Sequence, residues 1–169
     1  MTAHDTTPDL LALAQQLVYR ELRALDDQDW PTWLSYYHPD AEYWVPAWDK
    51  GLRPTTDPQR ELSLIYCASR RGLEERVSRL VSGRSPASTP LRRTAHAVTN
   101  LLVERAADQL QVHAVFHTMT YDWVARRDQT FFGTSTYRFH ATDAGWLIRH
   151  KRQVLMNDAL PGMVDFYWL

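Results

Sequence analysis

The chain has 169 residues, enough for one domain with a sizeable core and no need of cross-links. Its 19 basic and 20 acidic residues give a net charge of −1, so no overall field favours nucleic acid or an anionic membrane. No apolar run approaches the roughly 18–20 residues that span a bilayer, and the first ten residues lack a secretory pattern. The single cysteine, Cys67, excludes an internal disulfide and fits a reducing compartment. We therefore expect one cytoplasmic domain over residues 1–169.

An amphipathic helix is predicted over residues 8–27. Thr7, Pro8 and Asp9 form a typical helix start. Apolar residues then follow at the three-to-four spacing of one helix face. They are Leu10, Ala14, Leu17, Val18, Leu22 and Leu25. A cluster of aspartates ends the helix, as is typical of caps and turns.

A short second helix and an aromatic strand follow. Trp30, Trp33, Leu34 and Tyr37 fit one face of that helix. Asp40 then opens the run AEYWVP, which is aromatic and β-branched enough to predict a strand.

The middle of the chain alternates loops with short elements. We expect a surface loop over 47–60, a strand over 62–67, a helix over 72–81 and a loop over 82–94. Eight arginines stand against three glutamates between Arg60 and Arg93. Two interpretations stay open: a solvated helix face with i,i+4 pairs such as Glu75–Arg79, or a docking surface for an acidic partner.

From His96 onward the chain predicts an antiparallel sheet. Four long stretches rich in valine, threonine and aromatics are separated by turn clusters. Helices first and strands after predict an α+β fold, with the N-terminal helices packed on a strongly curved, mainly antiparallel sheet. Gly133 within a strand predicts a bulge or bend.

Histidines and the cysteine are the first candidates for chemistry. His113 and His117 have a spacing that chelates zinc on a helix, but the surrounding VHAVFHTMTYDW predicts a strand. Four strand residues span about 13 Å, whereas two ligands of one metal lie about 3–4 Å apart. This favours two histidines on one sheet face. Cys67 alone cannot supply a Rieske-type cluster, which needs two cysteines and two histidines.

Carboxylates are the second group of candidates. Asp26, Asp27 and Asp29 could act as general bases, but at a helix junction such residues are more often caps. A site of two histidines and one carboxylate is not excluded by counting, although no close cluster indicates it. We therefore predict no catalytic residue, no bound cofactor and no metal ligand.

The chain resembles a known family over nearly its whole length. The supporting pieces are YRELRALDDQDWPTWLSYYHPDAEYWVPAW (19–48), DPQRELSLIY (57–66), RGLEERVSRL (71–80), TAHAVTNLLVE (94–104), FFGTSTYRF (131–139), and WLIRHKRQVLMND with the DFYWL ending. Their order resembles the cystatin-like, nuclear-transport-factor-2-like cone. Within that superfamily the chain is most similar to the small (β) subunits of aromatic ring-hydroxylating dioxygenases, especially the benzoate and anthranilate group.

The resemblance implies a structural subunit without a cofactor. In such enzymes a large (α) subunit holds the [2Fe-2S] Rieske cluster and a mononuclear iron, and a separate reductase brings electrons from NADH. Three large subunits pack with three small ones, which implies self-association as a trimer and a hetero-oligomer that oxidises a benzoate- or anthranilate-like acid.

Subunit contacts are expected at exposed aromatic and basic positions. A tail as aromatic as DFYWL either folds back onto its own sheet or packs against a neighbouring subunit, and we favour the neighbour. The expected contact residues are Trp44, Trp48, Arg60, Phe166, Tyr167, Trp168 and Leu169.

Two alternatives from the same superfamily stay open: a stand-alone isomerase or dehydratase, and a small-molecule binding protein. In the register of ketosteroid-type isomerases the base falls on Val45 and the oxyanion-stabilising tyrosine on Glu21, and neither residue suits that role. His96 could serve a dehydratase with a nearby tyrosine, although nothing in the sequence pairs them. Both alternatives need an open pocket. We expect an interior filled by Trp, Tyr and Phe that holds no proton-handling group.

Overall fold

The computed structural model describes residues 8–50, 52–85, 88–157, 160, 162 and 164–169. The helices are α1 (Pro8–Asp26), α2 (Trp30–Ser35) and α3 (Arg70–Val81), with a 3₁₀ turn, η2 (Phe166–Trp168), near the end. The strands are β1 (Tyr37–Pro46), β2 (Ser63–Cys67), β3 (Arg93–Ala106), β4 (Gln109–Asp122), β5 (Arg127–Thr142) and β6 (Gly145–Leu155).

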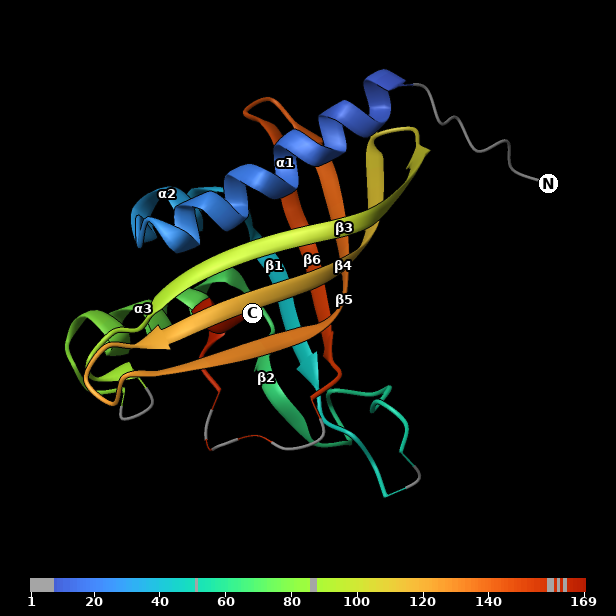
Figure 1. The fold of residues 1–169 in the computed structure, drawn as a ribbon. Helices are drawn as coiled ribbons and strands as arrows, with labels where there is room; N and C mark the ends of the chain where they lie inside the picture. Colours follow the sequence, from blue (N-terminus) through green and yellow to red (C-terminus); the bar gives the residue numbers. More distant parts are fainter. Residues whose placement is uncertain (1–7, 51, 86–87, 158–159, 161, 163) are drawn as a thin grey trace.

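The six strands form one open sheet in the order β2-β1-β6-β5-β4-β3. The last four strands pair antiparallel with their neighbours in the chain, which confirms the predicted meander. β1 pairs antiparallel with β2 and parallel with β6, so the sheet is mixed. The strands curve beneath α1, which lies beside β3, while α2 and α3 lie toward one end (Figure 1). The α+β prediction is confirmed.

The sheet has a buried inner face and a barer outer face. In β4 the buried residues alternate with more exposed ones along the strand. The inner residues pack toward α1, whose apolar stripe is buried as the helical spacing predicts. His113 and His117, four residues apart in this strand, both lie on the outer face, which confirms their predicted placement.

The junction between α1 and β1 differs in detail from the prediction. Asp29 caps α2, because its Oδ1 accepts a hydrogen bond from the Thr32 backbone N at 3.2 Å. α2 ends at Ser35, and β1 begins at Tyr37 rather than Asp40. On α3 the ion pairs are Arg70–Glu74 and Arg71–Glu75, so the solvated helix face is seen with a different pairing from Glu75–Arg79.

The sequence predicts a bulge or a bend at Gly133; the strand pairing shows no bulge there, and the glycine permits close packing. The register between β4 and β5 continues without a shift through Phe116↔Gly133. A Cβ at position 133 would overlap the carbonyl oxygen of Val154 and lie 2.9 Å from the Phe116 ring. Only glycine therefore lets β5 approach β6 this closely.

The C-terminal tail is part of the chain's own core. Phe166, Tyr167, Trp168 and Leu169 are each at most 1% exposed. The Phe166 ring stacks on Trp33 with centroids 4.9 Å apart. This corrects the expectation that the tail contacts a neighbour. Burying rings of this size at the end of the cone has a more favourable free energy than leaving them in water.

Candidate functional site

The interior of the cone holds an acid and a base. Glu21 from α1 and Lys151 from β6 are both 0% exposed, and Lys151 Nζ lies 3.0 Å from Glu21 Oε1 and 3.1 Å from Oε2. Because an unpaired charge at such depth is strongly unfavourable, each residue requires the other.

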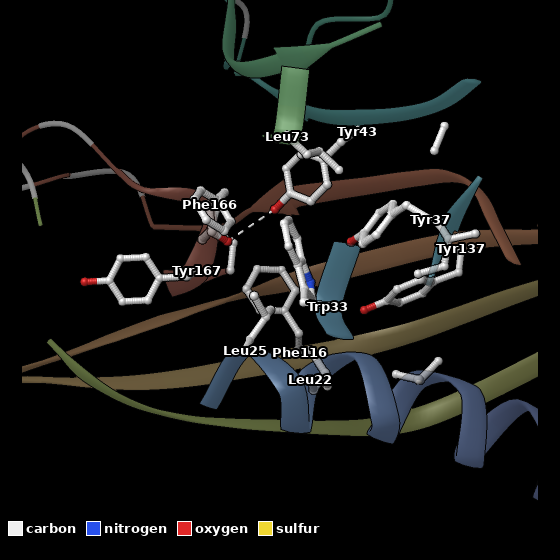
Figure 2. Packing of buried hydrophobic residues seen from close by; sticks show 14 of the residues in the cluster. Leu22, Leu25, Trp33, Tyr37, Tyr43, Leu73, Phe116, Tyr137, Phe166 and Tyr167 are labelled. Atoms are coloured by element: carbon white, nitrogen blue, oxygen red, sulfur yellow. Dashed lines mark hydrogen bonds between the residues drawn. The ribbon is translucent and has the colours of Figure 1, made fainter. Parts of the chain in front are cut away.

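Aromatic donors complete the surroundings of the Glu21 carboxylate. Trp33 Nε1 and the Tyr37 hydroxyl each donate to Oε1 at 2.7 Å, and the Tyr137 hydroxyl donates to Oε2 at 3.3 Å. Figure 2 shows the indole nitrogen of Trp33 and the two tyrosine hydroxyls turned toward one region of the core. The Lys151 ammonium also lies over the Tyr137 ring, 5.2 Å from its centroid. Every donor in this cluster is thereby directed at one carboxylate.

Burial governs the protonation of the cluster. It raises the pKa of Tyr37 and Tyr137 well above the ordinary value, and the charge of Glu21 raises both further, so both phenols stay neutral donors. Burial also lowers the pKa of Lys151, while the interaction with Glu21 opposes that shift. The cluster is suited to holding a fixed charge pair and not to exchanging protons with a ligand.

This cluster corrects the expectation of an interior without ionisable groups. The rings do fill the cone, as expected, but they enclose Glu21 and Lys151 as well. Neither residue lines the recess between α1 and α2, the recess beside His96 or the recess beside His150. The isomerase alternative requires a hydrogen-bond donor that a substrate can reach at the position of Glu21. Glu21 is instead enclosed, and its charge is balanced by Lys151.

A second acid–base pair joins α1 to β3. The Asp26 carboxylate accepts from the His96 backbone N at 3.0 Å and from the Thr94 hydroxyl at 2.8 Å, and it lies 2.6 Å from His96 Nδ1. Asp26 is therefore not a cap as expected, and His96 has a partner that the sequence did not reveal. Tyr19 lines the same small recess as this pair. The His96 side chain is only 2% exposed, so it offers no accessible base to a substrate.

The described residues do not include a donor set for a metal or cluster. No group of three or more His, Cys, Asp or Glu side chains converges among them. Cys67 is buried, and burial raises the pKa of its thiol, which favours a packing role. His113 Nδ1 lies 3.1 Å from the Thr136 hydroxyl, and His117 stacks on Phe132, so each has a neighbour in the sheet.

The remaining residues expected at interfaces lie near the ends of β1 and β2. Trp44 is 6% exposed and donates to the Ser63 hydroxyl at 2.9 Å, so its indole is mostly enclosed. Trp48 is 41% exposed and donates to the Leu155 carbonyl oxygen at 2.7 Å. Arg60 extends into solvent beside Asp57. Trp48 and Arg60 thus remain available for a partner.

Comparison with known proteins identifies the family. Residues 20–162 match the family described as ring hydroxylating beta subunit. The chain belongs to this family. The resemblance to dioxygenase β subunits is confirmed, and so is the expectation that the chain is a component of such an enzyme.

Close relatives are small subunits of dioxygenases. The 2-halobenzoate 1,2-dioxygenase small subunit of Burkholderia cepacia is 41% identical over 151 residues, covering 89% of this chain and 90% of the relative. The toluate 1,2-dioxygenase subunit beta of Pseudomonas putida is 40% identical over 154 residues, covering 90% and 94%.

Solved structures agree on the fold. The crystal structure of the benzoate 1,2-dioxygenase beta subunit of Burkholderia mallei superimposes with a TM-score of 0.78, with 35% identity and full coverage of both chains. A protein with a cystatin-like fold from Nostoc punctiforme, 11% identical, gives a TM-score of 0.59 over 88% of this chain and 91% of its own. The expected cystatin-like cone is confirmed.

Removing Lys151 should destabilise the fold strongly. In Lys151→Met the Glu21 carboxylate stays buried without its counter-charge, so we expect a loss of about 3–5 kcal/mol in the free energy of unfolding. Urea denaturation followed by tryptophan fluorescence measures this loss.

The matched control removes both charges. Glu21→Gln/Lys151→Met should recover part of the lost stability, because no unpaired charge remains. Glu21→Gln alone completes the comparison. A double variant as unstable as the sum of Lys151→Met and Glu21→Gln would show that the two charges do not act as a pair.

The Asp26 carboxylate should make part of the free energy of unfolding sensitive to acid. Burial alone would raise the pKa of Asp26, but its hydrogen bonds and charge interaction with His96, and the Thr94 hydroxyl, lower it below its ordinary value. The unfolded chain then binds the proton more readily, so this contribution is present above about pH 4 and is lost as the pH falls further.

Asp26→Asn should therefore flatten the loss of stability below about pH 4 while lowering stability at neutral pH. Urea midpoints at a series of pH values measure both effects. Exposed Asp108 provides the control: Asp108→Asn should follow the wild-type profile. An unchanged slope for Asp26→Asn would show that this carboxylate is not coupled to folding.

Proposed function

We propose that this chain is the structural, non-catalytic small subunit of a Rieske non-haem iron dioxygenase that acts on a benzoate- or anthranilate-like acid. The single observation that carries the proposal is the enclosed interior, where Glu21 and Lys151 are 0% exposed and surrounded by rings. Related folds that perform chemistry need an open hollow there. The relatives named for 2-halobenzoate and toluate support the class of substrate.

The iron centres are assigned to the partner. With one buried cysteine and no convergent donor set among the described residues, this chain does not fit a [2Fe-2S] Rieske cluster or a mononuclear iron. A large (α) subunit would hold both and receive electrons that originate from NADH. The small subunit would hold the large subunits in register, with three of each in the assembly.

The cellular compartment of the assembly is inferred from the composition of the chain. None of the described helices is long and apolar enough to cross a bilayer. A charge-balanced chain with a buried free thiol suits the cytoplasm, where we place the assembly.

Co-expression with the large subunit tests this function. We expect the chain to co-purify with an iron-containing subunit of larger mass, in a particle whose native mass equals three copies of each. The isolated chain should contain no iron and should not turn over aromatic acids. A stable monomer that forms no complex, or an isolated chain that converts a substrate, would contradict the proposal.

The exposed contact residues are tested in the same preparation. Trp48→Ala and Arg60→Ala should each lower the fraction of chain found in the large particle, because side chains of these types carry much of the binding energy at interfaces. An unchanged mass distribution in both variants would remove these residues from the interface.

A further inference from the structure

The outer face of the sheet carries two adjacent cross-strand rows of polar side chains. Residues directly opposite one another on paired strands share a face. The first row runs His113↔Thr136↔Arg152↔Trp44, and the second runs Gln111↔Arg138↔His150↔Glu42. The rows cross β4, β5, β6 and β1, which brings residues more than 100 positions apart in the chain into one patch.

A recess of about 370 Å³ opens between these rows. We call it the arginine recess and define it by Trp44, His113, Thr136, Arg138, His150 and Arg152. It lies on the opposite side of the sheet from the Glu21–Lys151 cluster.

The arginine recess is positively charged. Arg138 donates its Nε to Gln111 Oε1 at 3.1 Å, and the Arg152 guanidinium lies 4.8 Å from the Trp44 ring centroid. Neither arginine forms an ion pair with an acidic side chain of the described residues. The nearby Glu42 is already engaged, 2.9 Å from His150 Nδ1. Burial lowers the pKa of His150, so this imidazole does not balance the Glu42 carboxylate. Two guanidinium groups against one carboxylate leave the recess with a net positive charge.

Arg152 is partly withdrawn from water in this position. Its side chain is of intermediate burial, and burial lowers its pKa. A guanidinium held against an indole without an acidic partner bears a desolvation cost in the isolated chain. A carboxylate placed beside the Arg152 guanidinium would compensate for this desolvation cost, because a guanidinium can donate hydrogen bonds to both oxygens of a carboxylate.

The rest of the outer face indicates that the carboxylate belongs to a protein. Beyond the arginine recess the same face continues through Val115 and Val154 to Phe132 and Met119, which are 40% and 61% exposed. No described helix packs on this side of the strands. A free small anion would leave Phe132 and Met119 in water, whereas a protein surface would cover them and the recess together.

Few acidic side chains of a second copy of this chain are free to fill the arginine recess. Most acidic side chains of the described part already bind a partner within the chain, as in Asp27–Arg23 and Asp40–Arg149. The exceptions lie at the start of α1 and at strand ends or turns. They are Asp9, Asp108, Asp128 and Asp143.

We infer that the arginine recess receives an aspartate or glutamate side chain of the large subunit, with the apolar outer face packed around it. This inference rests on the proposed function and specifies the surface through which the small subunit binds the large one. Arg138 and Arg152 are then binding residues for the assembly and take no part in the oxidation.

Charge-neutral variants of the recess test this inference. The large subunit is immobilised and its affinity for Arg138→Gln, Arg152→Gln and the double variant is measured by interferometry at several salt concentrations. We expect the double variant to bind at least about tenfold more weakly and with a smaller salt dependence, since a desolvated charge pair is lost. Arg152→Lys should bind between wild type and Arg152→Gln.

Arg20→Gln is the matched control. Arg20 is exposed on α1, which packs on the inner side of the sheet, and it forms no ion pair among the described residues. It should bind like wild type. Unfolding midpoints of all variants confirm that they fold.

Three results would overturn the inference. They are unchanged binding by the double variant, loss of self-association instead of large-subunit binding, and saturable binding of free benzoate that the double variant abolishes. A wild-type chain that binds no large subunit would overturn the proposed function itself, and the inference with it.

Discussion

The structure depends on the burial of one ion pair. Glu21 and Lys151 come from opposite ends of the chain, and both lie where water does not reach. Such a pair is tolerated only when further donors satisfy the remaining oxygen lone pairs. Trp33, Tyr37 and Tyr137 supply these donors from α2, β1 and β5. Four regions of the chain are thereby brought to one carboxylate, which fixes how the helices sit on the sheet.

The same arrangement decides where function can lie. Glu21 and Lys151 are 0% exposed, so neither charge of the interior pair is presented to a partner, and recognition by charge is left to the outer surface. The outer sheet face offers the chemistry that the interior lacks, with guanidinium groups at one end and exposed Phe132 and Met119 at the other. The inner face specifies the fold, and the outer face is left to the assembly.

Local patterns predicted much of this architecture. The apolar stripe of α1, the meander from His96 onward and the strand placement of His113 and His117 follow from spacing and side-chain shape alone. The pairs Glu21–Lys151 and Asp26–His96 could not be predicted, because they join residues 130 and 70 positions apart. A lysine at an inward position of a strand was the available signal for the first. The burial of the tail likewise depends on a space that only the assembled cone defines.

Amine labelling followed by mass spectrometry tests the closed interior most directly, because the chain has only two lysines. Lys50 is exposed, whereas Lys151 is 0% exposed. In the native protein an acylating reagent should modify Lys50 and leave Lys151 unreacted until denaturant is added. Modification of Lys151 at a rate comparable to that of Lys50 would show that the cone is open to solvent, which would contradict the scaffold account.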